Sequence, residues 1–207
     1  MQIQATLNPA PAVAPELARK SFSSSQTIFS NRGPRIPVVV ESGWVGRVRN
    51  LADGRRQIVS LVLPGELLIP LDPDMNPSSE AICLGPAVCK PVLPRHISSE
   101  MMDSFRACER RWLDNQVVRL GRMNAREKLS HLMLEVRSRL ARSSGKWPAK
   151  FPFPLTQEHL ADLLGLTPVH VNRTLQALRT LGYIQLARHE LTILDPDGLS
   201  ETAPDLV

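Results

Sequence analysis

The chain has 207 residues and carries 25 lysines and arginines against 20 aspartates and glutamates, which gives a formal net charge of +5. A hydrophobic content of 43% is ordinary for a folded protein and argues against wholesale disorder. No apolar run reaches the roughly eighteen residues of a membrane-spanning helix, and three cysteines are too few for a disulfide framework.

The first twenty residues are rich in alanine and proline, so residues 1–20 are predicted to form a flexible N-terminal segment. The basic pair Arg19 and Lys20 follows the mildly apolar part of this segment, which is the reverse of the order in a secretory signal. We therefore expect a cytoplasmic protein without a membrane partner.

Residues 21–98 predict a small antiparallel β-barrel or jelly roll. Short apolar runs alternate here with turn signals: QTIF, IPVVVES, WVGRVRN, RQIVSLVL, ELLIP and EAICL. Several runs are β-branched, and Asp53-Gly54 joins two of them with a dipeptide typical of a β-hairpin. Many closely spaced short strands favour this architecture. Pro73 and Pro77 predict an irregular loop before the last strand.

From Ser99 the apolar residues recur with a helical period. We expect one helix over residues 99–122, capped by Ser98 or Ser99, with apolar positions at Met102, Phe105, Cys108, Trp112, Val117 and Leu120. A second helix starts in a sequence that resembles a capping box, Asn124 and Glu127, and its apolar stripe contains Leu129, Leu132, Met133, Val136 and Leu140. SSGKWPAKFPFP then predicts a linker or a short edge strand.

The stretch 156–184 predicts a helix-turn-helix. Thr156 can cap a first helix, and Gly165 supplies the left-handed backbone at its end. Thr167 can cap a second helix that has Pro168 at its first position. The inward residues are predicted to be Leu160, Leu163 and Leu164 in the first helix, and Val171, Leu175 and Leu178 in the second. Two helices with a short turn form this DNA-binding motif. GYIQLA and ELTIL, joined across Arg188-His189, predict a two-stranded wing.

The second helix has a polar outward face. Its outward positions are Val169, His170, Asn172, Arg173, Gln176 and Arg179, and no acidic residue occurs from Thr167 to Leu186. Arginine can bond guanine bidentately, and asparagine and glutamine can bond adenine in the same way. The segment 104–150 also carries twelve basic against four acidic residues. We therefore expect this helix to enter the major groove of double-stranded DNA. The alternative interpretation is a winged helix that contacts protein.

Several stretches resemble the Crp/Fnr family of bacterial transcription regulators. PLTQEHLADLLGLTPVHVNRTLQALRTLGYI resembles that family's DNA-binding motif, and LTILDPDGL resembles its wing strand and the stretch after it. VVVESGWVGRVRNLADGRRQIVSLVLPGELL resembles the middle of its cyclic-nucleotide-binding-like barrel. LGRMNAREKLSHLMLEV resembles the end of its dimerisation helix and the start of its DNA-binding domain. The resemblance covers about residues 26–200.

The resemblance implies an α+β protein with an N-terminal sensory barrel (21–98), a dimerisation helix (99–122) and a winged helix-turn-helix domain (123–207). It implies a homodimer whose recognition helices, residues 168–180, enter successive major grooves about 34 Å apart on a palindromic site. We assign base reading to Val169, Asn172, Arg173 and Gln176, and phosphate contact to Thr156, Thr167, His170 and Arg179. Of these, Arg173 matches the family's base-reading arginine, and Thr156, Thr167 and His170 match positions that commonly touch phosphate.

The sequence departs from the family pattern at several positions. Val169 stands where many members carry a glutamate that accepts from cytosine, so we expect an altered half-site. The stretch LLIPLDPDMNPSSEAICLGP has three carboxylates, Asp72, Asp74 and Glu80, and no arginine, which disfavours cyclic-nucleotide binding. Cys83, Cys89 and Cys108 are too few for a four-cysteine iron–sulfur cluster. No cofactor is expected.

A second hypothesis makes the barrel a small-molecule or protein-binding module whose C-terminal domain anchors it to DNA without sequence preference. An enzyme is not expected, because no nucleophile–base pair and no metal-ligand spacing occurs. The sequence leaves open the signal, the target genes, the choice between activation and repression, and any redox role of the cysteines. RNA polymerase would be a further partner of an activator.

Overall fold

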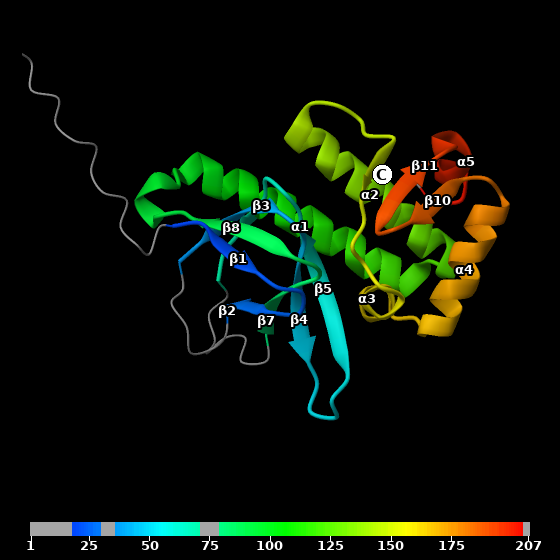
Figure 1. Ribbon diagram of the computed structural model, residues 1–207, viewed down its shortest axis with the longest axis horizontal. Helices are drawn as coiled ribbons and strands as arrows, with labels where there is room; N and C mark the ends of the chain where they lie inside the picture. The colour runs from blue at the N-terminus through cyan, green and yellow to red at the C-terminus, as the bar shows by residue number, and fades with distance from the viewer. Residues whose placement is uncertain (1–17, 30–35, 71–78, 205–207) are drawn as a thin grey trace, which may run out of the picture.

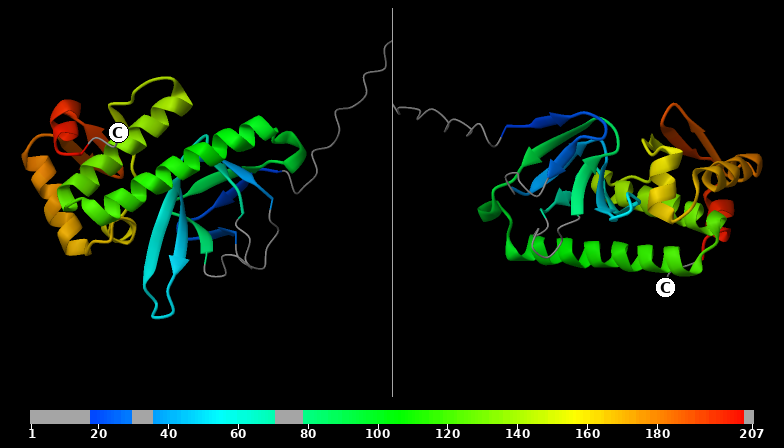
Figure 2. Two further views of the ribbon diagram at one scale, coloured as in Figure 1. Left: turned by 180° about the vertical axis from the view of Figure 1, so that it is seen from behind. Right: turned by 90° about the horizontal axis from the view of Figure 1, so that it is seen from below.

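The computed structural model describes residues 18–29, 36–70 and 79–204. The predicted loop at Pro73 and Pro77, the carboxylates Asp72 and Asp74, and most of the predicted flexible segment lie outside these residues. A strand-rich part and a mainly helical part lie next to each other, and one long helix runs along both of them (Figures 1 and 2).

The N-terminal domain is a jelly-roll-like pair of four-stranded sheets and not a closed barrel. Its strands are β1 (Lys20–Phe22), β2 (Thr27–Phe29), β3 (Val38–Ser42), β4 (Val45–Asn50), β5 (Arg56–Val62), β6 (Leu67–Leu68), β7 (Ser79–Cys83) and β8 (Ala87–Pro91). One sheet has the order β1-β8-β3-β6 and the other β2-β7-β4-β5. Their facing sides bury an apolar cluster that includes Val40, Val45, Leu68, Cys83 and Cys89. The expected antiparallel pairing is confirmed throughout this domain.

Two strands differ from the sequence prediction. β1 begins at Lys20, inside the segment for which flexibility is expected, because Lys20 pairs with Cys89. β8 pairs with both β1 and β3, yet the apolar pattern does not reveal it. Its residues Ala87, Lys90 and Pro91 belong to types that are depleted in strands. Hydrogen bonding to a strand on each side, which is a tertiary effect, outweighs the low strand propensity of these residues.

Helix α1 (Ser99–Arg122) has the predicted bounds. Ser98 is the residue that caps it, because its side chain accepts a hydrogen bond from the backbone N–H of Met101 at 3.1 Å. The buried residues of this helix are polar, Gln116 and Arg119, whereas Val117 is 70% exposed. The face of α1 that packs on its neighbours therefore makes hydrogen bonds and ion pairs as well as apolar contacts. A 3-10 turn (Pro94–His96) precedes the helix.

Helix α2 (Ala125–Ser144) starts with the predicted capping box. The Asn124 side chain accepts from the N–H groups of Arg126 and Glu127, and the Glu127 carboxylate accepts from the N–H of Asn124 at 2.7 Å. The helix ends at Gly145, whose φ of 70° is left-handed. The following strand β9 (Lys150–Pro152) lies at the edge of a three-stranded sheet of order β10-β11-β9. Of the two predictions for this stretch, a linker or a short edge strand, the structure therefore shows the edge strand.

The helix-turn-helix and the wing follow. They comprise α3 (Gln157–Leu164), α4 (Pro168–Thr180), β10 (Ile184–Ala187), β11 (Glu190–Ile193) and a short last helix α5 (Pro196–Glu201). The apolar core of this part continues into the jelly roll, where Trp44 meets Phe153 edge-to-face with ring centroids 5.5 Å apart. One contiguous core thus joins the two domains. No helix among the described residues is long and apolar enough to cross a membrane.

Candidate nucleic-acid interface

The turn between α3 and α4 is built from the predicted residues. Thr156 caps α3 by accepting from the N–H of His159 at 3.1 Å, and Thr167 caps α4 by accepting from the N–H of His170 at 3.2 Å. Gly165 ends α3 with a φ of 61°, a conformation that L side chains rarely adopt. Pro168 occupies the first turn of α4. These local signals fix where each helix begins and ends.

One side of α4 is buried and holds the helix in place. Val171, Leu175 and Leu178 are almost fully buried, as predicted, and they pack in the core shared with α3. Thr174 is buried too, and its hydroxyl donates to the carbonyl oxygen of His170 at 2.8 Å. The orientation of α4 about its own axis is therefore set by four buried side chains.

The opposite side of α4 is open. Val169 is 71% exposed, and the other exposed residues on the N-terminal three turns include His170, Asn172, Arg173 and Gln176. No acidic residue lies on α4. The structure thus places all four predicted base-reading residues on one exposed, neutral-to-basic helix surface. Such a surface has the donors and acceptors that read base edges in a major groove.

Arg179 was predicted to point outward with its side chain free, but in the structure its side chain is partly covered and bonded. It is half-buried, and its Nη2 donates to the carbonyl oxygen of Leu186 in β10 at 2.8 Å. The chain turns back at Gly182 to place β10 beside the end of α4, which brings this carbonyl within reach. The guanidinium of Arg179 therefore connects the last turn of the helix to the wing.

The wing ends in the predicted two-residue turn. Arg188 and His189 both have positive φ values, 51° and 60°, as a tight hairpin turn of the mirror-image type requires. Both residues are exposed. The carbonyl oxygen of His189 accepts from the N–H of Phe153 at 2.7 Å, which ties the turn to the chain after β9. The wing tip therefore presents two basic side-chain types to solvent.

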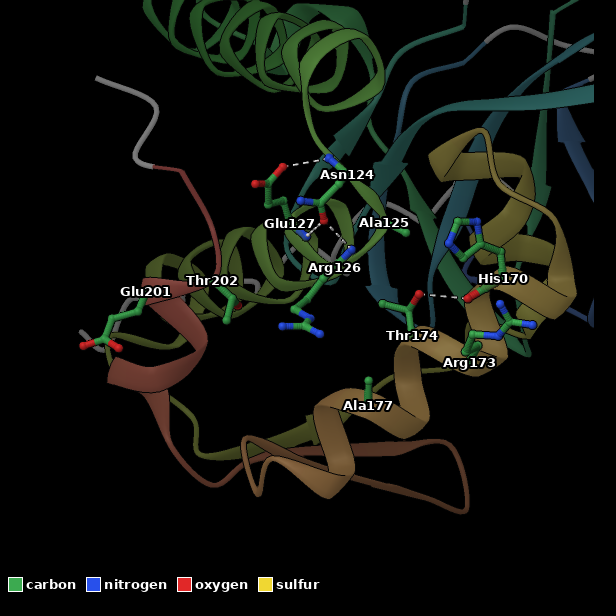
Figure 3. A pocket seen from close by; sticks show the side chains of 10 residues that line it. All are labelled: Asn124, Ala125, Arg126, Glu127, His170, Arg173, Thr174, Ala177, Glu201 and Thr202. Carbon is green, nitrogen blue, oxygen red and sulfur yellow. Dashed lines mark hydrogen bonds between the residues drawn. The ribbon is translucent and has the colours of Figure 1, made fainter.

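A hollow of about 650 Å³ lies between the start of α2 and one side of α4 (Figure 3). Arg126 reaches it from α2, His170 and Arg173 from α4, and the acidic residues Glu127 and Glu201 also line it. Sequence reasoning did not single out Arg126. Its position in the first turn of a helix, inside the basic segment 104–150, is the signal that could have found it.

The C-terminal end of α3 is held by buried donors. The carbonyl oxygen of Leu163 accepts from Gln57 at 3.2 Å and from Gln116 at 2.6 Å, and that of Leu164 accepts from Lys128 Nζ at 3.0 Å. Burial lowers the pKa of the Lys128 ammonium. Carbonyl groups at the end of a helix are short of intrahelical partners, so these bonds satisfy them. They also fix α3 to three other elements.

Cys83 and Cys89 lack the exposure and low thiol pKa of a reactive site. Cys83 and Cys89 are buried between the two sheets, and burial raises the pKa of the Cys83 thiol to about 11 and that of Cys89 to about 12. Both thiols are therefore protonated near neutral pH, and the thiolate is the reactive form. Among residues 18–29, 36–70 and 79–204, no group of three or more histidine, cysteine, aspartate or glutamate side chains could hold a metal ion.

A capped helix-turn-helix with an exposed reading face, a wing beside it and a jelly roll joined to it by a long helix define a DNA-binding transcription regulator. A Crp-like helix-turn-helix domain matches residues 127–202. The nitrogen fixation regulation protein FixK of Bradyrhizobium diazoefficiens is 32% identical over 193 residues, which cover 86% of this chain and 78% of that protein. The chain belongs to the Crp/Fnr family of transcription regulators.

Other relatives agree with this assignment. The transcriptional activator protein FnrL of Cereibacter sphaeroides is 28% identical and covers 90% of this chain and 80% of its own length. The structure of FixK2 from Bradyrhizobium japonicum is similar over 92% of this chain and 98% of that chain, with a TM-score of 0.78 and 22% identity. The latter likeness confirms the fold, which extends through both domains and the long helix.

Proposed function

We propose that this regulator binds a palindromic DNA site as a homodimer through α4. Val169, Asn172, Arg173 and Gln176 would read base edges in the major groove. The observation that carries this proposal is their common exposure on α4 while the opposite stripe is buried. Val169 cannot accept a hydrogen bond from cytosine but can contact a thymine methyl group, so the half-site would differ from that of members with a glutamate there.

Phosphate contacts would come from the N-terminal ends of α3 and α4 and from α2. Thr156, Thr167 and His170 lie exposed at the starts of α3 and α4. Arg126 extends this set, because it lies across the hollow from Arg173 and in the first turn of α2. Arg179 is assigned a different role, since its guanidinium already holds Leu186. Backbone contacts of this kind position the protein on DNA and make its affinity depend on salt.

The exposed surface of α1 supports the homodimer. Its exposed residues include three large apolar side chains, Met101, Val117 and Val118, which a second copy of the helix would cover.

We further propose an activator that works in the cytoplasm, where its target DNA lies, and that contacts RNA polymerase. The names of two relatives support activation: FnrL, and the transcriptional activatory protein AadR of Rhodopseudomonas palustris, which is 34% identical over 74% of this chain. The protein would need neither a cyclic nucleotide nor an iron–sulfur cluster. The carboxylates between β6 and β7 and the small number of cysteines support this part of the proposal.

Selection of bound fragments from a random DNA pool tests the proposed function. An enriched inverted repeat, with half-sites one helical turn apart, is the expected result. No enrichment at low salt would instead favour a binding module with a non-specific DNA anchor. Sedimentation of the protein with and without the selected DNA measures the expected two copies per site.

A further inference from the structure

The jelly roll is attached to the DNA-binding domain at both ends of one strand, β5. At its start, Arg56 Nε and Nη2 lie 2.8 and 2.6 Å from Asp162 Oδ2 of α3, and Gln57 donates to Leu163. We name this the hairpin contact, because Arg56 belongs to the β4–β5 hairpin, which extends beside α3 (Figure 1). It connects the two domains by ionic and amide hydrogen bonds.

At the other end of β5, Arg139 of α2 makes the second attachment. Its Nη2 donates to the carbonyl oxygen of Leu61 at 2.7 Å, and its Nε and Nη2 bond the two oxygens of Glu66 at 2.9 and 2.6 Å. We name this the turn contact, because Glu66 lies in the turn between β5 and β6. The side chain of Arg139 is only 3% exposed, and its guanidinium lies 3.8 Å from the ring centroid of Trp112.

The two contacts do something that the apolar core between the domains does not. The apolar core holds the two domains together, and the ion pairs add directional bonds to it, because the hydrophobic effect itself is non-directional. The Arg139–Glu66 pair is bidentate and so has a defined geometry, and Arg56 adds two directional bonds to one oxygen of Asp162. β5 has seven residues and spans about 20 Å, so attachment at both its ends prevents rotation about either one. The Arg139–Glu66 pair is buried, and the Arg56–Asp162 pair is partly exposed. Pairs of either kind add little net stability, which makes geometric specificity the better account of them.

The angle of the DNA-binding domain decides where α4 meets DNA. In α2, Arg139 lies about 22 Å along the helix from Asn124, which begins the end nearest α4. A tilt of about 10° at Arg139 would move that end by about 4 Å, close to the rise of one base pair. In a dimer, an equal tilt in each copy would change the separation of the two recognition helices by up to twice that distance.

We infer that the hairpin contact and the turn contact set the half-site spacing that the dimer accepts. Arg56, Asp162, Glu66 and Arg139 are then positioning residues: they do not touch DNA, and they determine which spacer between half-sites is bound. This inference rests on the proposed palindromic site. It predicts that weakening either contact relaxes the discrimination between spacers and leaves recognition of one half-site unchanged.

The test compares the 207-residue chain and its variants on three kinds of DNA duplex. The first carries the selected half-site once. The second carries it twice with the selected spacer, and the third carries it twice with a spacer one or two base pairs longer or shorter. Arg56→Ala removes the ionic part of the hairpin contact and leaves Asp162 partly exposed to solvent, where water can hydrate it. Arg55→Ala is the matched control, because the neighbouring Arg55 is 77% exposed and pairs only with Asp53 among the described residues. Glu66→Gln weakens the turn contact.

Arg56→Ala and Glu66→Gln are each expected to reduce the ratio of affinities for correct and altered spacers about three- to fivefold, the range of one partly buried ion pair. Affinity for the single half-site should stay within twofold in every variant. Exchange of the two charges, Arg56→Asp with Asp162→Arg, should restore the ratio at least in part. A merely structural role would lower binding to all duplexes by one common factor.

Equal loss on all spacers, or an Arg56→Ala protein that behaves as Arg55→Ala does, overturns the inference. A wild-type protein that binds all spacers alike also overturns it, even while it recognises the half-site. Failure of the proposed function has a different signature, because wild type would then bind the single half-site no better than random DNA.

Discussion

The Nη2 atom of Arg179 lies 2.8 Å from the carbonyl oxygen of Leu186, so the last turn of the recognition helix is bonded to the first strand of the wing. The carbonyl oxygen of Leu178, one residue before Arg179, accepts from the N–H of Tyr183 in the same corner. Two hydrogen bonds therefore connect the end of the helix to the wing. Arg179, for which the sequence predicted a phosphate contact, has one guanidinium nitrogen engaged in this connection.

Arg179→Ala should loosen the wing and weaken DNA binding without a change in base preference. The loss of one charge-assisted hydrogen bond costs about 1.5–3 kcal/mol of local stability. Amide hydrogen exchange of residues 184–193 should rise relative to that of α3. Thr180→Ala is the control, because Thr180 is exposed and adjacent. Unchanged exchange in the wing would show that Arg179 is available to phosphate after all.

Arg173→Ala should reduce affinity for the selected site and leave random DNA binding nearly intact. One bidentate arginine–guanine contact gives about 1–3 kcal/mol of discrimination, or about 5- to 150-fold. Titration of both DNAs at one salt concentration measures the ratio. A base-reading role for Arg173 would be excluded by equal losses on the two DNAs.

Arg126→Ala should weaken binding to specific and random DNA alike. A phosphate contact carries no sequence information, and its removal should lower the slope of log affinity against log salt by about one. Affinities at four or more salt concentrations give this slope. Arg122→Ala is a suitable control, because Arg122 is exposed two residues before the capping box and outside the hollow. An unaltered slope would mean that Arg126 makes no phosphate contact.

Gly165→Ala should cost more stability than Gly145→Ala. Both glycines have left-handed φ values, 61° and 70°, so each substitution pays a similar backbone cost of about 1–2 kcal/mol. A Cβ at Gly165 would also lie 3.3 Å from the Leu120 side chain, whereas one at Gly145 meets nothing within 4 Å. The difference between their free energies of unfolding in urea isolates this crowding. Equal values would show that Leu120 yields without cost.

Local signals predicted the helical half well. Caps, the glycine at Gly165 and the stripes of Val171, Leu175 and Leu178 each act within a few residues, so the sequence alone shows where α3 and α4 begin, end and face. Once the buried side of α4 is known, its exposed side is known as well, because the two lie opposite each other on one helix. The two-residue wing turn was predicted for the same reason.

Features that depend on distant partners were not predicted. Lys20 becomes a strand residue only because β8 lies beside it, and β8 itself has few residues of high strand propensity. The bond from Arg179 to Leu186 depends on how the chain turns at Gly182. The contacts of Arg56 and Arg139 each join residues more than seventy positions apart. Contacts between such distant residues cannot be predicted from the periodicity or spacing within one segment.

We expect His131 to make the free energy of unfolding depend on pH. Its Nδ1 lies 2.7 Å from Nη2 of Arg119, which is always a donor, so the imidazole accepts there and is neutral. Burial, and then the charge of Arg119, lowers the pKa of His131 from 6.5 to about 4, although Glu135 acts in the opposite sense. Protonation of this ring would place two cations in contact.

The sign of the effect follows from the two states. Below pH 6.5 the unfolded chain takes up a proton at His131 that the folded chain does not bind, so the free energy of unfolding falls as the pH drops towards 4. More than about one pH unit above 6.5 this group is neutral in both states and contributes no pH dependence. Between pH 6.5 and 4.5 we expect a loss of about 1–2 kcal/mol from His131, after allowance for its partial exposure to solvent.

His131→Gln separates this contribution from others in the same window. The glutamine amide oxygen can accept from Arg119 and does not titrate. His159, whose pKa is also lowered, chiefly by burial and then by Arg56, remains in both proteins and cancels in the comparison. Urea unfolding at half-unit steps from pH 7.5 to 4.5 should give a shallower pH dependence for the variant. Parallel curves would show that His131 is protonated in the folded protein at the same pH as in the unfolded chain.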